Sequence, residues 1–348
     1  MRHQRFAAAV LALALTPILS GQAPKALTLN GDYPLTHDPS IAKDEGTYYV
    51  FATALSPDEG QFPMRCSRDL LTWKRCGKVF DQIPAWIHEA SPKTDILWAP
   101  DISYFQGKYH LYYAYSAFGV NTSGIALATN ETLDLKSPKY HWHDEGLVLK
   151  STAKDDYNAI DPNIVFDKQG QPWLSFGSFW SGIKMRRLDA ATGKTSSADT
   201  KTYALASRAK PENAEPAKPG LPPDWEAIEA PFIVRHQGYY YLFVSFDLCC
   251  RGTKSSYRTM VGRSRNVTGP YVDAAGKPML KGGGTALLAG NTRWLGPGGE
   301  SVMQRPEGDL IVFHAYDAIS GKPALQISTL TWEDEWPHAA LGTAGESK

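Results

Sequence analysis

Three acidic residues stand at similar places in three similar segments of the chain. Asp38 lies in HDPSI, Asp161 in AIDPNI and Glu229 in AIEAPF, each ahead of alternating apolar residues and a turn glycine. A carboxylate can take a proton from water while a carboxylic acid gives a proton to a leaving oxygen. Hydrolysis of a glycosidic bond with inversion uses such a pair, held roughly 6.5–9.5 Å apart. Asp38 and Glu229 suit this chemistry if the fold places them across a cleft.

The segments around these acids are copies of one hairpin pattern. In each copy, a strand with alternating apolar residues leads to a turn glycine, and a second strand follows. The fourth copy, residues 227–247, is the clearest, with Tyr239 to Phe246 as its aromatic second strand. Counting back from the turn glycine, by eight residues in the first copy and nine in the others, gives Asp38, Trp98, Asp161, Glu229 and Gly299. Three of these five positions are carboxylates.

Each acid by itself has a structural explanation. Asp38 and Asp161 precede prolines, where aspartate commonly starts a turn, and Glu229 could be a salt-bridged residue at a strand end. Burying three carboxylates close together is costly, so a purely structural reason for the cluster is hard to find. Their coincidence at one repeat position therefore favours a functional cluster.

The spacing of the copies predicts the fold. The intervals between the five positions are 60, 63, 68 and 70 residues, which suits a four-stranded propeller blade and is too long for a solenoid repeat. We predict an all-β chain in which residues 24–348 form a single five-bladed β-propeller, with the five positions in a ring at one end of its axis. The segment Thr195 to Asp224 lacks the pattern and is predicted as a solvated surface loop, with shaping of a cleft as the alternative. The early segment Leu27 to Leu29 could pair with the last blade.

Composition and the N-terminal residues limit the partners and the location. The chain has 36 basic and 36 acidic residues spread along it, so no charged surface for nucleic acid or an anionic membrane is expected. Residues 1–23 have basic residues, an apolar run and small residues at the end, which predicts a secretory signal peptide, with an uncleaved anchor as the alternative. We expect a monomer that is secreted or periplasmic and does not bind a membrane.

The four cysteines fit an oxidising compartment without requiring it. Cys66 and Cys76 could cross-link neighbouring strands of the first blade. Cys249 and Cys250 are adjacent, and we expect them to be buried thiols that pack as small apolar residues, with a vicinal redox switch as the alternative.

Several motifs together resemble a known family. HDPSI, LWAPDI, AIDPNI, FGSFWSGI, EAPF and SSYRTMVGRS are similar, in order and spacing, to the arabinanases of glycoside hydrolase family 43. The resemblance covers essentially the whole chain after residue 23, and it implies a five-bladed β-propeller that cleaves α-1,5-linked L-arabinan. It also implies that Asp38 is the general base, that Glu229 is the general acid, and that Asp161 orients Glu229 and adjusts its pKa.

A furanose substrate also needs flat apolar walls and directed hydrogen bonds. Trp98 is the first candidate for an aromatic platform, and the resemblance places Phe118 along the same cleft. Phe118 and Trp180 could equally be core residues, since most aromatic residues in β proteins are. The full set of candidate substrate-binding residues is Trp98, Phe118, Gly119, Asn158, Ser178 and Trp180.

The fifth copy departs from the family. Many family members carry a histidine, which holds an ion on the axis, at the position of Gly299 in this chain. We therefore expect no metal site and no required cofactor. Glu300 could compensate only if its side chain turned toward the axis, and alternation along a strand argues against that. His314 is predicted to be a hydrogen-bonded core histidine, with a metal ligand as the alternative.

Other functions remain open on the same fold. An exo-acting arabinofuranosidase or xylosidase would share the acids and differ in the loops that close the cleft, so the sequence does not decide between endo and exo cutting. A glycan-binding propeller without activity would be expected to lack one of the three acids, and all are present. A retaining enzyme would need its two carboxyl groups about 5–5.5 Å apart, and FGSFWSGI argues against that class.

Overall fold

The computed structural model describes residues 22–214 and 222–343. The predicted signal peptide, residues 1–23, lies outside the described residues except for its last two positions. Within the described ranges, no helix is long and apolar enough to cross a membrane.

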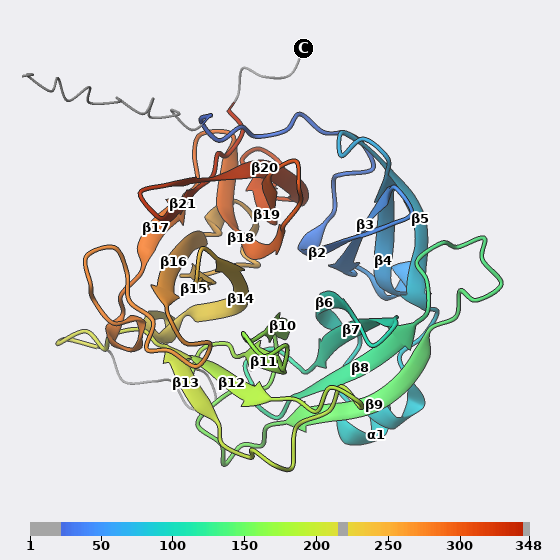
Figure 1. Cartoon of the computed structure of the whole chain (residues 1–348), viewed down its shortest axis with the longest axis horizontal. Coiled ribbons are helices and arrows are strands. Elements are labelled where there is room, and N and C mark those ends of the chain that lie inside the picture. Colours follow the sequence, from blue (N-terminus) through green and yellow to red (C-terminus); the bar gives the residue numbers. More distant parts are fainter. Residues whose placement is uncertain (1–21, 215–221, 344–348) are drawn as a thin grey trace, which may run out of the picture.

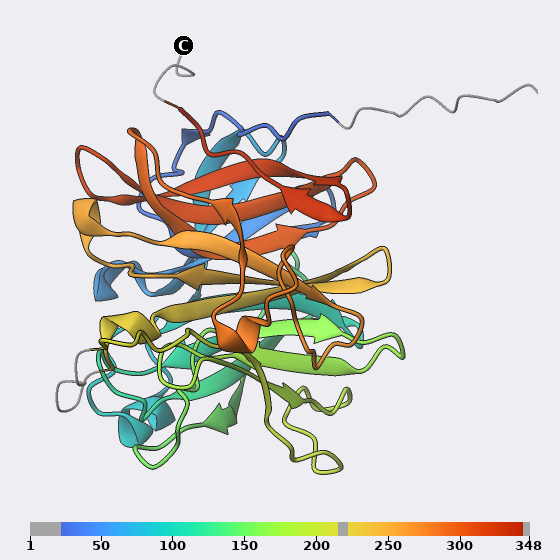
Figure 2. The same ribbon diagram turned by 90° about the vertical axis from the view of Figure 1, so that its left-hand side faces the viewer.

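Five sheets surround a central axis, and each sheet is one blade (Figure 1). The side view in Figure 2 shows that loops leave the blades at both ends of this axis. The strands, blade by blade, are β1 (Asn30–Gly31), β2 (His37–Asp44), β3 (Thr47–Thr53), β4 (Gln61–Ser67) and β5 (Thr72–Phe80); β6 (Trp98–Phe105), β7 (Lys108–Tyr115), β8 (Gly124–Asn130) and β9 (His143–Lys150); β10 (Asn163–Phe166), β11 (Pro172–Phe176), β12 (Ile183–Arg187) and β13 (Tyr203–Ala206); β14 (Ile228–His236), β15 (Tyr239–Phe246), β16 (Arg258–Ser264) and β17 (Thr285–Leu288); β18 (Trp294–Met303), β19 (Asp309–Asp317), β20 (Pro323–Glu333) and β21 (Trp336–His338). The described helices are short: α1 (Ala85–Ala90), η1 (Pro57–Glu59), η2 (Asp224–Glu226), η3 (Gly252–Lys254) and η4 (Met279–Lys281). The predicted five-bladed propeller is confirmed.

Each blade begins with the predicted hairpin near the axis. In the fourth blade, β14 pairs antiparallel with β15, and the second strand covers the predicted residues, Tyr239 to Phe246. The prediction for Thr195 to Asp224 as a solvated loop was wrong in part. Tyr203–Ala206 forms β13, the outer strand of the third blade, and Asp224 lines the large cleft described below. A strand this short offers too few alternating residues to stand out in the sequence.

The hydrophobic core lies between the blades. One cluster joins blades one and two, with Phe51 and Phe62 packed near Leu111 and Tyr113, and comparable clusters fill the other four interfaces. Most central strands are therefore buried on both faces, which explains their nearly continuous apolar runs. The interfaces fix the blades around the axis, and this arrangement sets the positions of the loops at its ends.

The N-terminal segment closes the ring. The Leu27 N–H donates to the Ile327 carbonyl of the last blade, and Ala26 forms a bridge with Ser328. The next residues, Asn30 and Gly31, pair in parallel with β5 of the first blade. The expected pairing of the early segment with the last blade is thus present, and the same segment also bonds to blade one.

The disulfide between Cys66 and Cys76 is confirmed. It joins β4 to β5, adjacent strands of the first blade, and both residues pack against the core between blades one and two.

Candidate active site

The first strand of a blade carries a bulge near the axis. In β2, His37 pairs with Thr53 and Ser40 pairs with Phe51, so two residues, Asp38 and Pro39, oppose one residue of β3. Asp38 has a φ of 47°, in the left-handed region, which re-aims its side chain. The same break in register occurs in β6, β14 and β18. The residues that share this left-handed conformation are Asp38, Ala99, Asp161, Ala230 and Gly299.

The predicted ring of equivalent positions is therefore wrong by one residue in two blades. Trp98 and Glu229 precede the bulge residues Ala99 and Ala230 and correspond to His37 in blade one. The error came from the turns. The turns of blades one, two and four have left-handed φ values at two consecutive residues ending in glycine, as in a tight two-residue hairpin, whereas blades three and five use longer turns. The bulge residue lies eight residues before the turn glycine in blades with the two-residue turn and nine before it in blades with the longer turn, so a count of nine overshoots by one residue in blades two and four.

All three acids nevertheless lie in one cleft of about 760 Å³ at the axis. Every predicted substrate-binding residue also lines it. The lining residues named from the sequence are Asp38, Trp98, Phe118, Gly119, Asn158, Asp161, Ser178, Trp180 and Glu229. Blades one to four each contribute at least one of them, so the fold assembles the cleft from segments far apart in the chain.

Asp38 is held in its charged form. Its Oδ2 atom lies 2.8 Å from Nδ1 of His37 and accepts a hydrogen bond of 2.8 Å from the Thr53 hydroxyl. Burial favours the neutral acid, but His37, His314 and Thr53 outweigh it and lower the pKa of Asp38 to about 2. Asp38 is thus suited to accept a proton.

Glu229 has the opposite character. It is buried, and its Oε2 atom accepts a hydrogen bond of 2.5 Å from the Ser178 hydroxyl. Burial raises the pKa of Glu229 to about 7, with a further contribution from the charge of Asp38, although the bonds and charges of Ser178 and His37 oppose the rise. Glu229 can therefore keep a proton under mildly acidic conditions.

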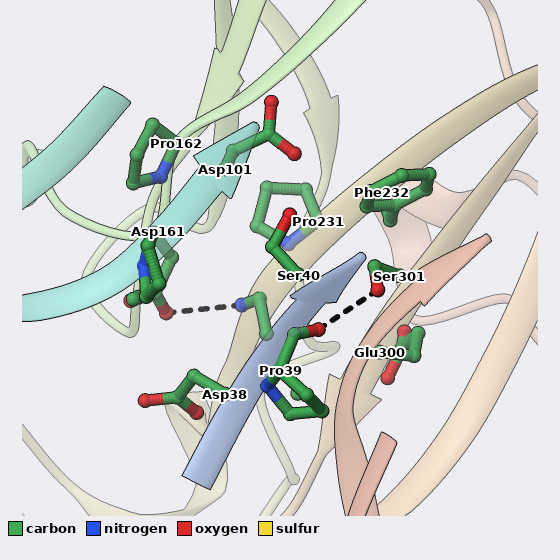
Figure 3. Close-up of a pocket in the computed structure, with 14 residues that line it drawn as sticks. Asp38, Pro39, Ser40, Asp101, Asp161, Pro162, Pro231, Phe232, Glu300 and Ser301 are labelled. Carbon is green, nitrogen blue, oxygen red and sulfur yellow. Dashed lines mark hydrogen bonds between the residues drawn. The ribbon is translucent and has the colours of Figure 1, made fainter. Parts of the chain in front are cut away.

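Asp161 lies beside both acids. Its Oδ2 atom accepts a hydrogen bond of 3.1 Å from the backbone N–H of Ala230, the residue after Glu229, and Figure 3 shows this bond between the third and fourth blades. Burial and the charges of Glu229 and Asp38 raise the pKa of Asp161 well above its ordinary value. Ionisation of either Glu229 or Asp161 therefore opposes ionisation of the other.

The aromatic candidates form part of the cleft wall. Trp98 and Phe118 lie with ring centroids 5.0 Å apart, and Phe118 is 80% exposed, so it is not a core residue. Trp180 is partly buried and faces the same cleft. Asn158 is buried, and its Oδ1 atom has no hydrogen-bond partner among the described residues. The three aromatic side chains offer flat apolar faces to a ligand in the cleft, and Asn158 offers its Oδ1 atom as a hydrogen-bond acceptor.

Two contacts of His37 in the cleft were not predicted, and one expectation about the cysteines was wrong. His37 bonds to Asp38, and the Tyr316 hydroxyl lies 2.8 Å from the other ring nitrogen of His37. Cys249 and Cys250 form a disulfide in the cleft wall, and Cys250 is exposed, so the expectation of buried thiols was wrong. The position of His37 beside Asp38 in HDPSI was the available signal. Tyr316 lies in the neighbouring fifth blade but is 279 residues away in the sequence, so no local pattern connects it to His37.

Gly299 leaves no room for a side chain unless its neighbours move. A Cβ atom on Gly299 would lie 2.8 Å from Oδ1 of Asp38 and 2.8 Å from Nδ1 of His314. His314 is fully buried, accepts a hydrogen bond from the Asp38 N–H, and stacks on His37. The expectation of a hydrogen-bonded core histidine is thus confirmed. His314, Asp38 and His37 also place three atoms that could bind a metal ion close together. In this structure those atoms contact one another.

Glu300 points away from Asp38, as expected from strand alternation. Its Oε2 atom accepts hydrogen bonds from the hydroxyls of Ser245 and Thr259 in the fourth blade. Burial raises the pKa of Glu300 to about 8. Glu300 therefore keeps its proton near pH 7, and it lines a small axial cavity of about 30 Å³ (Figure 3).

Asp101 has a structural role in the same region. Its Oδ2 atom accepts a hydrogen bond from the Ile164 N–H of the next blade, and the corresponding Ser40 and Asn163 accept from Ile102 and Ile233 in the same way. These side chains link blade one to two, two to three and three to four, so Asp101 helps to join the blades.

Comparison with known proteins agrees with this geometry. Residues 28–337 match the family described as glycosyl hydrolases family 43. The chain is 42% identical over 339 residues to the extracellular endo-α-(1→5)-L-arabinanase 1 of Bacillus subtilis (strain 168), with 97% of each chain covered. It is 40% identical over 305 residues to the extracellular exo-α-(1→5)-L-arabinofuranosidase of Cellvibrio japonicus (strain Ueda107), with 86% of this chain and 85% of that protein covered. The solved structure of a GH43 endo-arabinanase from Bacillus licheniformis matches with a TM-score of 0.79 and 43% identity over 90% of this chain and 99% of that chain. The propeller, its axial cleft and these matches together show that the chain belongs to glycosyl hydrolase family 43.

Proposed function

We propose that this protein is an inverting endo-1,5-α-L-arabinanase in which Asp38 is the general base and Glu229 is the general acid. The observation that carries the proposal is the contrast between two acids in one cleft. The pKa of Asp38 is lowered to about 2 and that of Glu229 is raised to about 7. Between these values one group accepts a proton while the other donates one, which is the division of roles that inverting hydrolysis needs.

The proposed reaction is a single displacement. Asp38 takes a proton from a water molecule, whose oxygen attacks the anomeric carbon of the arabinofuranose from the face opposite the leaving oxygen. Glu229 gives its proton to that leaving oxygen as the glycosidic bond breaks. The products are a sugar with inverted configuration and a shortened chain, and proton exchange with solvent restores both acids.

Asp161 acts through Glu229 in this proposal. Its bond to the Ala230 N–H fixes the backbone next to Glu229, and the two acids oppose the ionisation of each other, so an ionised Asp161 favours protonated Glu229. Asp161 thereby helps Glu229 to stay protonated until the leaving oxygen arrives.

Arabinan as the substrate is supported by the names of both relatives and by the walls of the cleft. Trp98 and Phe118 present aromatic faces to a furanose ring, and Asn158 and Ser178 offer polar atoms. Trp180 and Gly119 complete this binding surface. We infer that these six residues contact the arabinose units.

Endo cutting is preferred because the endo-acting relative matches 97% of the chain, whereas the exo-acting relative matches 86%. Exo cutting is the second candidate, since the exo-acting relative is almost as similar. A time course on linear α-1,5-arabinan separates them. Mixed oligosaccharides at early times support endo cutting, and a single short product from the start supports exo cutting. An intact polymer in this assay would contradict the arabinanase proposal.

Export is proposed from residues 1–23, and it is supported by the word extracellular in the names of both relatives. Two disulfides in the described residues fit an oxidising compartment. The mass of the protein recovered outside the cytoplasm tests the proposal, because cleavage near Ala23 predicts a defined loss from the full chain. The expectations of a monomer and of no required cofactor stay predictions, which size-exclusion chromatography and a chelator assay can check.

A further inference from the structure

The vicinal disulfide has no part in the proposed reaction, although it lines the cleft. Cys249 and Cys250 lie in the loop between β15 and β16. Cys250 has a φ of 64°, in the left-handed region that residues with a Cβ atom rarely adopt. The small ring formed by adjacent bonded cysteines leaves their backbone few other conformations. The disulfide therefore holds the Cys250 peptide in a fixed orientation.

That peptide begins a chain of hydrogen bonds which ends at Asp38. The Cys250 N–H donates to the Tyr316 hydroxyl oxygen at 2.9 Å, and the Tyr316 oxygen lies 2.8 Å from Nε2 of His37. Nδ1 of His37 lies 2.8 Å from Oδ2 of Asp38. Sγ of Cys250 is itself only 3.8 Å from Nε2 of His37. A loop of blade four and strands of blades five and one thus meet at Asp38, the proposed general base.

The direction of these bonds follows from the donors. An ionised carboxylate only accepts, so Nδ1 of His37 carries a proton and donates it to Oδ2 of Asp38. The other ring nitrogen, Nε2, is partnered by the Tyr316 oxygen, which also accepts from the Cys250 N–H. The imidazole is therefore held between Tyr316 and Asp38, and its position sets the orientation of the Asp38 carboxylate.

We propose that the Cys249–Cys250 disulfide is a positioning element for Asp38, acting through Tyr316 and His37, and that its reduction slows hydrolysis. This inference rests on the proposed function, because it assigns Asp38 the role of general base. Opening the ring frees the Cys250 N–H to leave Tyr316. The Tyr316 hydroxyl and His37 can then turn, and the carboxylate loses its fixed direction toward the attacking water.

The reductive step is a thiol–disulfide exchange with a dithiol such as dithiothreitol. One thiolate of the reductant attacks Sγ of exposed Cys250, and Sγ of Cys249 leaves as a thiolate that takes up a proton. The second thiolate of the reductant then displaces Sγ of Cys250, which is protonated in turn, and the reductant closes to its cyclic disulfide. The reductant supplies both electrons and both protons, and the protein gains two thiols.

The other role open to the disulfide is a wall that touches the sugar. Such a wall would affect the affinity for substrate, whereas a positioning element affects the catalytic rate. The two roles are therefore separated by measuring kcat and KM individually on a linear α-1,5-arabino-oligosaccharide. They are also separated by Tyr316→Phe, which breaks the chain and leaves the disulfide in place.

The experiment uses the mature protein carrying Cys66→Ser and Cys76→Ser, so that only the vicinal pair can be reduced. Its kcat in the oxidised form is first compared with that of the wild-type protein, and the two are expected to agree because the first disulfide lies outside the cleft. Dithiothreitol is then added until mass spectrometry after alkylation counts two thiols. Reduction is expected to lower kcat about tenfold with little change in KM, and reoxidation to restore it.

The decisive comparison adds Tyr316→Phe to the same protein. Here kcat should already be low in the oxidised form, and reduction should lower it no further, because both changes break one chain. Equal losses on reduction with and without Tyr316 would overturn the proposal, as would an unchanged kcat with two thiols counted, or a rise in KM alone. An oxidised wild-type protein that leaves the oligosaccharide intact would instead overturn the proposed function itself.

Discussion

The hydroxyl of Ser178, on the third blade, donates a 2.5 Å hydrogen bond to Oε2 of Glu229, on the fourth. This bond favours the ionised carboxylate, so it limits the rise in pKa that burial imposes on Glu229. The balance between these two effects places the pKa of the proposed acid close to neutrality.

The pH dependence of hydrolysis follows from this balance. Glu229 must be protonated and Asp38 ionised, so kcat/KM should fall as the pH rises through about 7, while Asp38 stays ionised down to about pH 2. Ser178→Ala removes a bond to the ionised form, so the alkaline fall should move to higher pH. A kcat/KM profile on arabino-oligosaccharide between about pH 4 and 9 checks both statements. A shift to lower pH in the variant would contradict the assignment.

Substitution of the acids should separate their roles. Asp38→Asn and Glu229→Gln should each lower kcat on arabinan by about 100-fold to 10,000-fold, without unfolding the protein. On an arabino-oligosaccharide with a nitrophenyl leaving group, which needs little protonation, Glu229→Gln should recover most activity and Asp38→Asn should not. Asp161→Asn should lower kcat on arabinan and shift the pH at which kcat/KM falls on the alkaline side. Asp101→Asn is the control, because Asp101 joins blades and bonds to neither acid. Full activity of Glu229→Gln on arabinan would sink the scheme.

Loss of the exposed aromatic platform should weaken binding. Phe118→Ala removes an 80% exposed ring that contacts Trp98, so KM for linear arabino-oligosaccharide should rise by about threefold to tenfold. The melting temperature should hardly change, because little core packing is lost. Tyr104→Ala, which removes a 58% exposed ring outside the cleft, should leave KM unaltered. Equal changes in KM for the two variants would show that Phe118 is not part of the binding surface.

A side chain at position 299 should disturb the general base. Gly299→Ala places a Cβ atom 2.8 Å from Oδ1 of Asp38 and from His314, so Asp38 must move. We expect kcat to fall by about 10-fold to 100-fold, as displaced catalytic groups usually cost. Gly107→Ala is the matched control, because Gly107 also has a left-handed φ but a Cβ there meets nothing within 4 Å. It should cost stability in a thermal melt while kcat holds. A Gly299→Ala enzyme with full activity would show that Asp38 tolerates the contact.

Much of the fold and part of the site could be read from the sequence. Alternating apolar residues and turn glycines are local signals, and they recur in every blade, so the five hairpins and the propeller followed from their spacing. Asp38, Asp161 and Glu229 stood out because they recur near the same place in that repeat. The strand Tyr239–Phe246 was predicted with its observed bounds.

Only the tertiary structure decided three features. These are the equivalence of the bulge positions, the disulfide between Cys249 and Cys250, and the hydrogen bonds that connect Cys250 to Asp38. Blade four has the same two-residue turn as blade one, so a count of nine from its turn glycine overshoots the bulge by one residue and matches Glu229 to Asp38, although Glu229 corresponds to His37. Tyr316 and Cys250 reach His37 from other blades, and contacts between distant segments leave no periodic trace in a sequence. Local chemistry therefore determined the blades and their acids. The packing of the blades around the axis determined which side chains shift the pKa values of those acids and orient their carboxyl groups.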